Sequence, residues 1–270
     1  MSLPQIIGFG AQKAGTTWLF DNLATNPGIW CPVLKEMHYF NHVQSGSRWM
    51  VAKHRQRIVH AHEKALEKGD HQKADDLARL MATEIMTENW YREAYRPCPA
   101  DLTSMDITPA YALLEDDALD HMGKLLGDRF RAIFLIRDPA ARAISSVKKE
   151  MSEAGPSQAT IDFWLEAVCK REVVIRSNYR ATINRLDDKL GDRVLYLPFG
   201  MIKTDPIGLM RQVEKHCNLP EGEYKQAKKP KHVSPLVEIP EGLNEAVSIL
   251  LRDQYKCLES RFDRAMVRQV

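Results

Sequence analysis

The sequence has few cysteines and no long apolar run. Its five cysteines are an odd number, lie far apart and form no C-x-x-C pair: Cys31, Cys98, Cys169, Cys217 and Cys257. This spacing argues against a disulfide framework and a zinc cluster, and it favours a reducing compartment. No apolar stretch approaches the roughly 20 residues that a membrane span needs, and the first residues lack the basic start of a signal peptide. We therefore expect a soluble, cytoplasmic protein without a metal site.

The sequence also lacks an excess of charge of one sign. The formal net charge of its 270 residues is +2 at pH 7, so no global field marks a nucleic-acid or membrane-surface binder. Hydrophobic residues make up 44% of the chain, and no internal repeat or low-complexity tract divides it. These features predict a single domain over residues 1–270 with a small or locally recognised partner. They leave the oligomeric state open.

Short apolar strands alternate with amphipathic helices along most of the chain. An isoleucine-rich run at 5–9 stops at a glycine, and apolar residues at helical spacing follow over 16–24. Further strands are expected over 131–136 and 194–197. Strands that alternate with helices predict an α/β fold with a P-loop-type central parallel sheet, flanked by helices on both faces.

Capping residues mark the later helices. Asp138-Pro139 and Asp205-Pro206 each supply a cap and a first-turn proline. A helical stripe over 113–126 ends at a glycine, and a last amphipathic helix is expected over 243–262.

Residues 46–95 break this rhythm. The segment is charged and nearly free of strand-forming residues, and Gly69-Asp70 is its only obvious turn. We interpret it as a helical hairpin inserted into the α/β core. Its basic residues could draw an anionic acceptor towards a site, or they could form an ordinary charged face.

A glycine-containing loop at 10–17 separates the first expected strand from the first helix. It has the glycine spacing of a P-loop, in which backbone N–H groups and the positive end of the following helix hold a phosphate or sulfate. The lysine expected after the second glycine is replaced by Thr16, and Lys13 lies inside the loop instead. The strand 131–136 is followed by Arg137 and not by an aspartate that would hold magnesium. The loop therefore predicts a phosphate or sulfate site that takes no triphosphate and requires no metal.

Two motifs resemble those of the PAPS-dependent sulfotransferase superfamily, in which PAPS is 3'-phosphoadenylyl sulfate. Gln12-Lys13-Ala14-Gly15-Thr16-Thr17 matches the family's 5'-phosphosulfate loop, and Arg137 with Ser145 is similar to its 3'-phosphate motif. An arginine fork and a hydroxyl on the same side would read that 3'-phosphate. The resemblance implies PAPS as the cofactor, with these binding residues: Gln12, Lys13, Ala14, Gly15, Thr16, Thr17, Trp18, Arg137, Ser145, Tyr179, Lys229 and Lys231.

A third segment, 35–40 (KEMHYF), is similar to one in heparan-type and bacterial carbohydrate sulfotransferases. The resemblance implies that Glu36 is the general base, because a neutral hydroxyl is a poor nucleophile. Lys13 would stabilise the charge that develops on the transferring group and on the leaving phosphate oxygen. His38 is the competing base, since in an extended segment it would share a face with Glu36.

The acceptor side departs from the family pattern. Residues 106–111 (DITPAY) resemble a segment in which heparan-type enzymes carry a lysine where this chain has Ile107. The change removes a cation near the acceptor, which Lys35 could replace, and it weakens the case for a heparan-like substrate. Residues 228–232 (KKPKH) lie at the family's late cofactor-closing loop, although a solvated charged loop is an equal interpretation.

The sequence thus predicts a sulfotransferase that moves a sulfuryl group from PAPS to a hydroxyl or amine of a carbohydrate or small molecule by in-line displacement. Two alternatives stay open: a P-loop kinase of small molecules, and a non-catalytic module that binds phosphoadenosine nucleotides. The misplaced lysine argues against the kinase, and Glu36 near the loop argues against the module. The acceptor is not predicted, because specificity depends on pocket shape.

Overall fold

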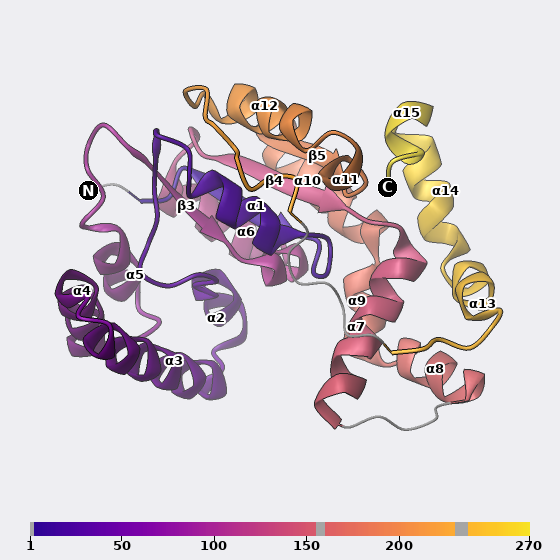
Figure 1. Cartoon of the computed structure of the whole chain (residues 1–270), viewed down its shortest axis with the longest axis horizontal. Coiled ribbons are helices and arrows are strands. Elements are labelled where there is room, and N and C mark those ends of the chain that lie inside the picture. Colours follow the sequence, from indigo (N-terminus) through magenta and orange to yellow (C-terminus); the bar gives the residue numbers. More distant parts are fainter. Residues whose placement is uncertain (1–2, 155–159, 230–236) are drawn as a thin grey trace.

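The chain folds around a five-stranded parallel sheet, shown in the computed structural model of Figure 1. The structure describes residues 3–154, 160–229 and 237–270. The strand order is β2-β3-β1-β4-β5, with bounds Ile6–Gly10 for β1, Ile29–Trp30 for β2, Thr103–Ile107 for β3, Arg131–Ile136 for β4 and Val194–Pro198 for β5. The predicted α/β fold with a central parallel sheet is confirmed.

The first strand, β1, is the centre of the sheet. It pairs with β3 on one side and β4 on the other, so that Ile7 lies opposite both Asp106 and Ala132. Because all the strands are parallel, the segments that follow them emerge at one edge of the sheet. The loop at 10–17, the segment after β3 and Arg137 after β4 therefore meet there.

Helices cover both faces of the sheet (Figure 1). Helices α1 and α12 lie on one face, and α6 and α10 lie on the other. Their bounds are Thr16–Leu23 for α1, Pro206–Cys217 for α12, Asp116–Leu126 for α6 and Tyr179–Leu190 for α10. Short helical elements complete the connections: η1 Pro109–Leu113, η2 Gly191–Arg193 and α11 Met201–Thr204. The helices predicted over 16–24, 113–126 and from Asp205-Pro206 are confirmed, although the second begins at Asp116 and only Leu113 of its predicted start lies in η1.

The insertion is helical, as predicted. It contains α3 (Arg48–Glu67) and α4 (His71–Ala82), which form the hairpin around Gly69-Asp70, and a further helix, α5 (Glu88–Tyr95). It follows α2 (Tyr39–Ser45), and Figure 1 shows these four helices together on one side of the sheet. Ser47, Asp70 and Thr87 cap α3, α4 and α5 by accepting a backbone N–H through their side chains, which fixes where each helix begins.

A second group of helices lies at the other end of the molecule (Figure 1). It comprises α7 Pro139–Ala154, α8 Ile161–Val168, α9 Arg171–Ser177, α13 Leu243–Leu250, α14 Arg252–Arg261 and α15 Arg264–Val267. The prediction of one helix over 243–262 was wrong, because the chain breaks at Leu251. The two halves pack into different clusters: α13 buries Val247 against α7 and α8, whereas α14 buries Leu258 in the main core.

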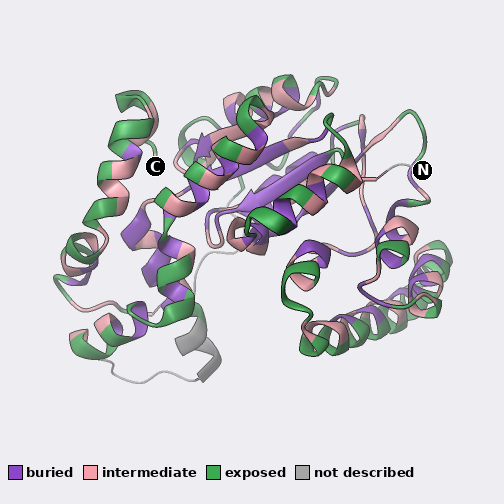
Figure 2. Ribbon diagram, turned by 180° about the vertical axis from the view of Figure 1, so that it is seen from behind, coloured by how far each residue is buried: buried purple, intermediate pink, exposed green. Residues whose placement is uncertain are grey.

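The buried apolar side chains form two clusters, and Figure 2 shows the strands as the most buried part of the chain. The larger cluster joins strand residues such as Ile133 to insertion residues such as Ile58 and Trp90, which are all fully buried. The insertion is therefore packed onto the α/β core. A single domain over residues 1–270 stays a prediction. Among the described residues, no helix is long and apolar enough to cross a membrane.

Candidate active site

The loop between β1 and α1 is shaped by left-handed backbone conformations. Gly10 has a φ of 122°, Lys13 of 70° and Gly15 of 84°. A β-carbon on Gly15 would overlap the Ile202 side chain and lie 3.2 Å from the Phe199 ring. Glycine is required at position 15 for both reasons, the positive φ and the close approach. This backbone turns tightly into the N-terminus of α1, as an anion-binding loop must.

The other predicted cofactor residues of this loop differ in their exposure to solvent. Gln12 and Thr17 are partly exposed, whereas Ala14 and Thr16 are buried. Thr17 Oγ1 accepts a hydrogen bond of 2.8 Å from Lys35 Nζ, which also lies 5.2 Å from the centre of the Phe20 ring. The lysine of the segment 35–40 therefore lies against the loop, so two motifs that the sequence placed in one site are in contact.

Arg137 joins the loop from β4. Its Nη1 donates a 2.7 Å hydrogen bond to the carbonyl oxygen of Lys13, and its guanidinium lies 4.8 Å from the centre of the Phe199 ring. Burial lowers the pKa of Arg137, yet an arginine remains charged at neutral pH. The two motifs that resemble donor-binding elements, 124 positions apart, thus meet at one edge of the sheet.

Tyr179, predicted as a cofactor residue, supports Arg137. Its hydroxyl donates to the Arg137 carbonyl at 2.8 Å and lies 3.4 Å from the Arg137 amide nitrogen. The side chain is 1% exposed, and burial raises its pKa to about 12. Tyr179 therefore fixes the main chain of Arg137 from beneath the site.

The helix after β4 carries the second part of the 3'-phosphate motif. Asp138 caps α7 by accepting from the Ala141 amide at 2.7 Å, as the sequence predicted. Ser145 lies two turns into the helix and is 3% exposed. Arg142 is fully buried between α7 and α9, where it donates to the Val173 carbonyl at 2.9 Å and to Ser177 Oγ. Burial lowers its pKa to about 10, so this buried guanidinium adds a positive charge beneath the motif.

Glu36 and His38 approach each other by an unexpected route. The prediction of an extended segment was wrong: Glu36 has a φ of 57° and His38 of 54°. The turn still brings Glu36 Oε2 to 3.6 Å from His38 Nε2, and it leaves the two side chains 36% and 23% exposed. Both groups are therefore within reach of a ligand.

The charges around Glu36 favour its ionised form. Burial would raise its pKa, but His38, Lys35 and Arg57 together hold it below the ordinary 4.5. His38 Nδ1 lies 3.1 Å from Asn41 Oδ1, while the Asn41 amide donates to the Ala110 carbonyl at 3.0 Å. This pairing places the Nδ1 proton towards Asn41, so that Nε2 of a neutral His38 carries the lone pair. The geometry therefore leaves two candidate proton acceptors.

The segment 106–111 contains a buried hydrogen-bond network centred on one carboxylate. Asp106 is 1% exposed and accepts from Thr108 at 2.6 Å, from Tyr111 at 2.8 Å and from Tyr91 of the insertion at 2.9 Å. Burial raises the pKa of its carboxyl, and the three hydroxyl donors oppose that shift. Ile107 is 1% exposed and packs against Gly8, so its side chain belongs to the core.

The remaining predicted cofactor residues come from α1 and from the late basic loop. Trp18 is buried, and its indole N–H donates to the Ala227 carbonyl at 2.9 Å, which ties α1 to the segment before the late basic loop. Lys229, which lies in that loop, is exposed. Lys231 lies outside the described residues.

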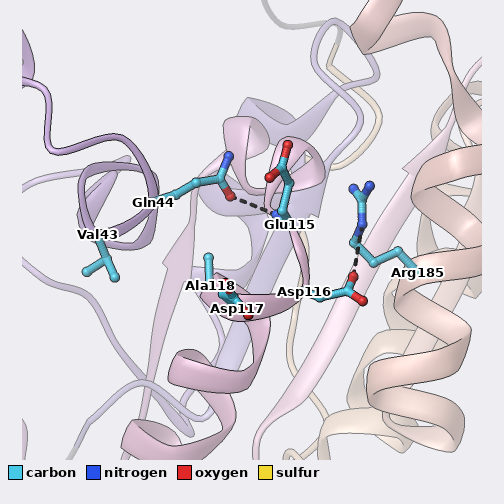
Figure 3. Close-up of a pocket in the computed structure, with 7 residues that line it drawn as sticks. All are labelled: Val43, Gln44, Glu115, Asp116, Asp117, Ala118 and Arg185. Atoms are coloured by element: carbon cyan, nitrogen blue, oxygen red, sulfur yellow. Dashed lines mark hydrogen bonds and ion pairs between the residues drawn. The ribbon is translucent and has the colours of Figure 1, made fainter.

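A pocket of about 530 Å³ lies between α2, α6 and α10 (Figure 3). Gln44 closes one side through a 2.7 Å bond from the Glu115 amide, and Arg185 faces Asp116 at 3.4 Å on the other. Its lining residues are Val43, Gln44, Glu115, Asp116, Asp117, Ala118 and Arg185. None of the predicted donor-site or base residues is among them.

Sequence reasoning missed two residues that contact the site. Phe199 after β5 stacks on Arg137, and Arg57 of α3 donates to the main chain of the segment 35–40. Phe199 follows a predicted strand, a position where site residues of parallel sheets gather. Arg57 lies in a charged helix whose pattern carries no such signal.

Comparison with known proteins agrees with the geometry. A sequence profile described as the sulfotransferase family matches residues 4–223. The chain superimposes on a sulfotransferase from Alicyclobacillus acidocaldarius with a TM-score of 0.69 and 16% identity, covering 99% of this chain and 100% of that one. Two sulfotransferase domains, from the curacin biosynthetic pathway and from the Synechococcus PCC 7002 olefin synthase, each give a TM-score of 0.53. Their identities are 15% and 18%, with 93% and 97% of this chain covered and 99% and 97% of theirs. A comparison with curated proteins gave no match.

Proposed function

The chain belongs to the sulfotransferase family, and on that premise we propose that it transfers the sulfuryl group of PAPS to a hydroxyl or amine of a carbohydrate or small molecule, with Glu36 as the base. The observation that carries this proposal is the 2.7 Å hydrogen bond between Arg137 and the Lys13 carbonyl. It joins the sulfate-binding loop to the 3'-phosphate motif at the spot where the segment 35–40 also arrives.

The donor side would be held by backbone and cationic groups. The loop amides up to Thr17 and the N-terminus of α1 suit a 5'-phosphosulfate, and Lys13 adds a positive charge. Arg137 and Ser145 suit the 3'-phosphate, with Arg142 buried beneath them. Trp18, which is bonded to Ala227, and Lys229 would contact the remaining part of the nucleotide. The tight loop that such a site needs is supported by Gly15, where a β-carbon would overlap Ile202.

PAPS supplies the sulfuryl group and leaves as 3'-phosphoadenosine 5'-phosphate (PAP). The acceptor oxygen or nitrogen forms a bond to sulfur while the bond from sulfur to the 5'-phosphate oxygen breaks. Glu36 takes the acceptor proton, and Lys13 offsets the charge on the leaving phosphate. Lys35, bonded to the Thr17 hydroxyl of the loop, would supply the cation that the core residue Ile107 does not. The acceptor proton thus passes to Glu36, and the charge of the leaving phosphate is offset by Lys13.

The two alternatives make different predictions. A P-loop kinase would need ATP with magnesium, whereas the residue after β4 is the cation Arg137. A non-catalytic module would need no base, whereas Glu36 is partly exposed and favoured in its ionised form. Both observations support a sulfotransferase over its rivals.

Transfer of radiolabelled sulfate from PAPS to a panel of sugars, phenols, aliphatic alcohols and amines, in the presence of EDTA, tests the proposal. We expect a labelled product from one acceptor class, because the site supplies its charges from side chains and not from a metal. Tight PAP binding without transfer to any class would favour the non-catalytic module. Phosphorylation from ATP that EDTA abolishes would favour the kinase.

A further inference from the structure

Helix α3 of the insertion is in direct contact with the turn that carries the base. Arg57, half-buried on this helix, donates from Nη2 to the Lys35 carbonyl at 2.6 Å and from Nη1 to the Glu36 carbonyl at 3.1 Å. Two successive carbonyls of the segment 35–40 are thus gripped by one guanidinium. Such a forked contact fixes both position and orientation, because the donors of a guanidinium are rigid and coplanar.

The gripped turn has an uncommon backbone. Glu36 and His38 both adopt left-handed conformations, which residues other than glycine seldom adopt and which persist only where the surroundings enforce them. The Arg57 bonds act on the carbonyl of Glu36 itself and on the one before it. They are therefore placed where they can enforce the turn that brings Glu36 towards His38.

His54, one turn earlier on α3, locks Arg57 in place. Its Nε2 lies 2.9 Å from Arg57 Nη1 and 3.3 Å from the Glu36 carbonyl oxygen, and its Nδ1 lies 3.3 Å from the Met50 carbonyl. A guanidinium only donates and its contact is the shorter one at Nε2, so the geometry favours Nε2 as the acceptor and Nδ1 as the proton carrier. His54 is 3% exposed, and its burial together with the charge of Arg57 lowers its pKa to about 4. The neutral ring is thus a fixed acceptor for Arg57 at physiological pH.

We propose that Arg57 is a positioning residue for the general base, and that the helical insertion sets the catalytic geometry by holding the main chain of Lys35 and Glu36. This role rests on the proposed function of Glu36. It gives the insertion a part in catalysis that neither an acceptor-attracting surface nor a charged solvent face would have.

Arg57→Met and Arg57→Lys separate the hydrogen bonds of Arg57 from its charge, and Arg55→Met, at an exposed position of the same helix, is the matched control. We expect kcat to fall about 10²-fold in both Arg57 variants, the loss typical of a misplaced reacting group, with PAP affinity unchanged. The acidic limb of kcat/KM should move to higher pH in Arg57→Met only. In that variant Lys35 and His38 still lower the pKa of Glu36, but the contribution of the Arg57 charge is lost, so the pKa rises. Added guanidinium should restore part of the activity of Arg57→Met.

Hydrogen exchange of the backbone amides of residues 35–40 gives a readout that needs no turnover. We expect faster exchange in both Arg57 variants and wild-type exchange in Arg55→Met. Unchanged exchange, or an unchanged kcat despite faster exchange, would overturn the role of Arg57. A parallel loss of PAP binding and thermal stability, without a shift of the acidic limb, would reduce Arg57 to a structural residue. If the wild-type protein binds PAP but transfers no sulfate, the proposed function fails, and exchange alone then decides whether Arg57 holds the turn.

Discussion

Replacing Lys13 by alanine is expected to lower kcat for sulfuryl transfer by about 10³-fold, near the upper end for the loss of one preorganised electrostatic group. Lys13 lies in the loop between β1 and α1, two residues before Gly15, and its own carbonyl is bound by Arg137. This bond fixes the main chain of Lys13, and under the proposed function its ammonium offsets the charge that develops on the leaving phosphate. Single-turnover transfer from PAPS, measured beside the binding of PAP, gives the size of the effect.

The matched control for this variant is Lys256→Ala, which removes one exposed lysine from α14. Lys13 already has a positive φ, and alanine meets the same steric restriction there, so we expect Lys13→Ala to keep its melting temperature. Near-normal turnover of a folded Lys13→Ala would refute the role of this lysine. The loop would then act through its backbone amides alone.

Glu36→Gln is expected to lose about 10²- to 10⁴-fold in transfer, the usual contribution of a general base, while PAP binding is retained. The amide keeps the size of the side chain but cannot take the acceptor proton at neutral pH. In the wild-type protein, kcat/KM should fall as the pH drops through the lowered pKa of Glu36, below about 4.5, because the base works only when ionised. Protonation of His54, whose pKa is about 4, removes the acceptor of Arg57 in the same range and adds to the fall. A pH profile from 3.5 to 8 with a slowly reacting acceptor measures this limb.

His38→Ala decides between the two proton acceptors. With Glu36 as the base, His38→Ala should keep most of the activity, since the carboxylate still faces the acceptor. An inactive His38→Ala beside an active Glu36→Gln would transfer the role of base to His38.

The sequence predicted the fold best where local pattern and burial agree. The strand β4 has the predicted bounds because a continuous apolar run ends at Arg137 and Asp138 caps the helix that follows. The strands β2 and β3 were missed for the opposite reason. One is two residues long, and the other carries the buried Asp106, whose partners Tyr91 and Tyr111 come from elements that no local pattern joins to it.

The candidate site, like the fold, contains residues that the sequence could predict and residues that it could not. Lys13 and Arg137 form motifs whose residues follow strands, and parallel strands bring such residues together at one edge. The turn at Glu36 and His38 could not be predicted, because its main chain is bonded to Arg57, which lies in a helix beyond α2 in the chain. Neither could the buried Arg142, whose acceptors Val173 and Ser177 belong to a helix that the sequence did not reveal. The conformations of the turn and of Arg142 depend on tertiary hydrogen bonds and not on local sequence preference.

Calorimetric titration with PAP, compared with ATP plus magnesium and with 5'-AMP, tests the donor site most directly. A site built from the loop at 10–17 and from Arg137 with Ser145 should bind PAP, require no metal for it, and bind 5'-AMP far more weakly, because 5'-AMP lacks the 3'-phosphate. Arg137→Met should weaken PAP and leave 5'-AMP nearly unchanged. Equal affinity for PAP and 5'-AMP, or a preference for ATP with magnesium, would contradict the assignment of this edge of the sheet as a PAPS site.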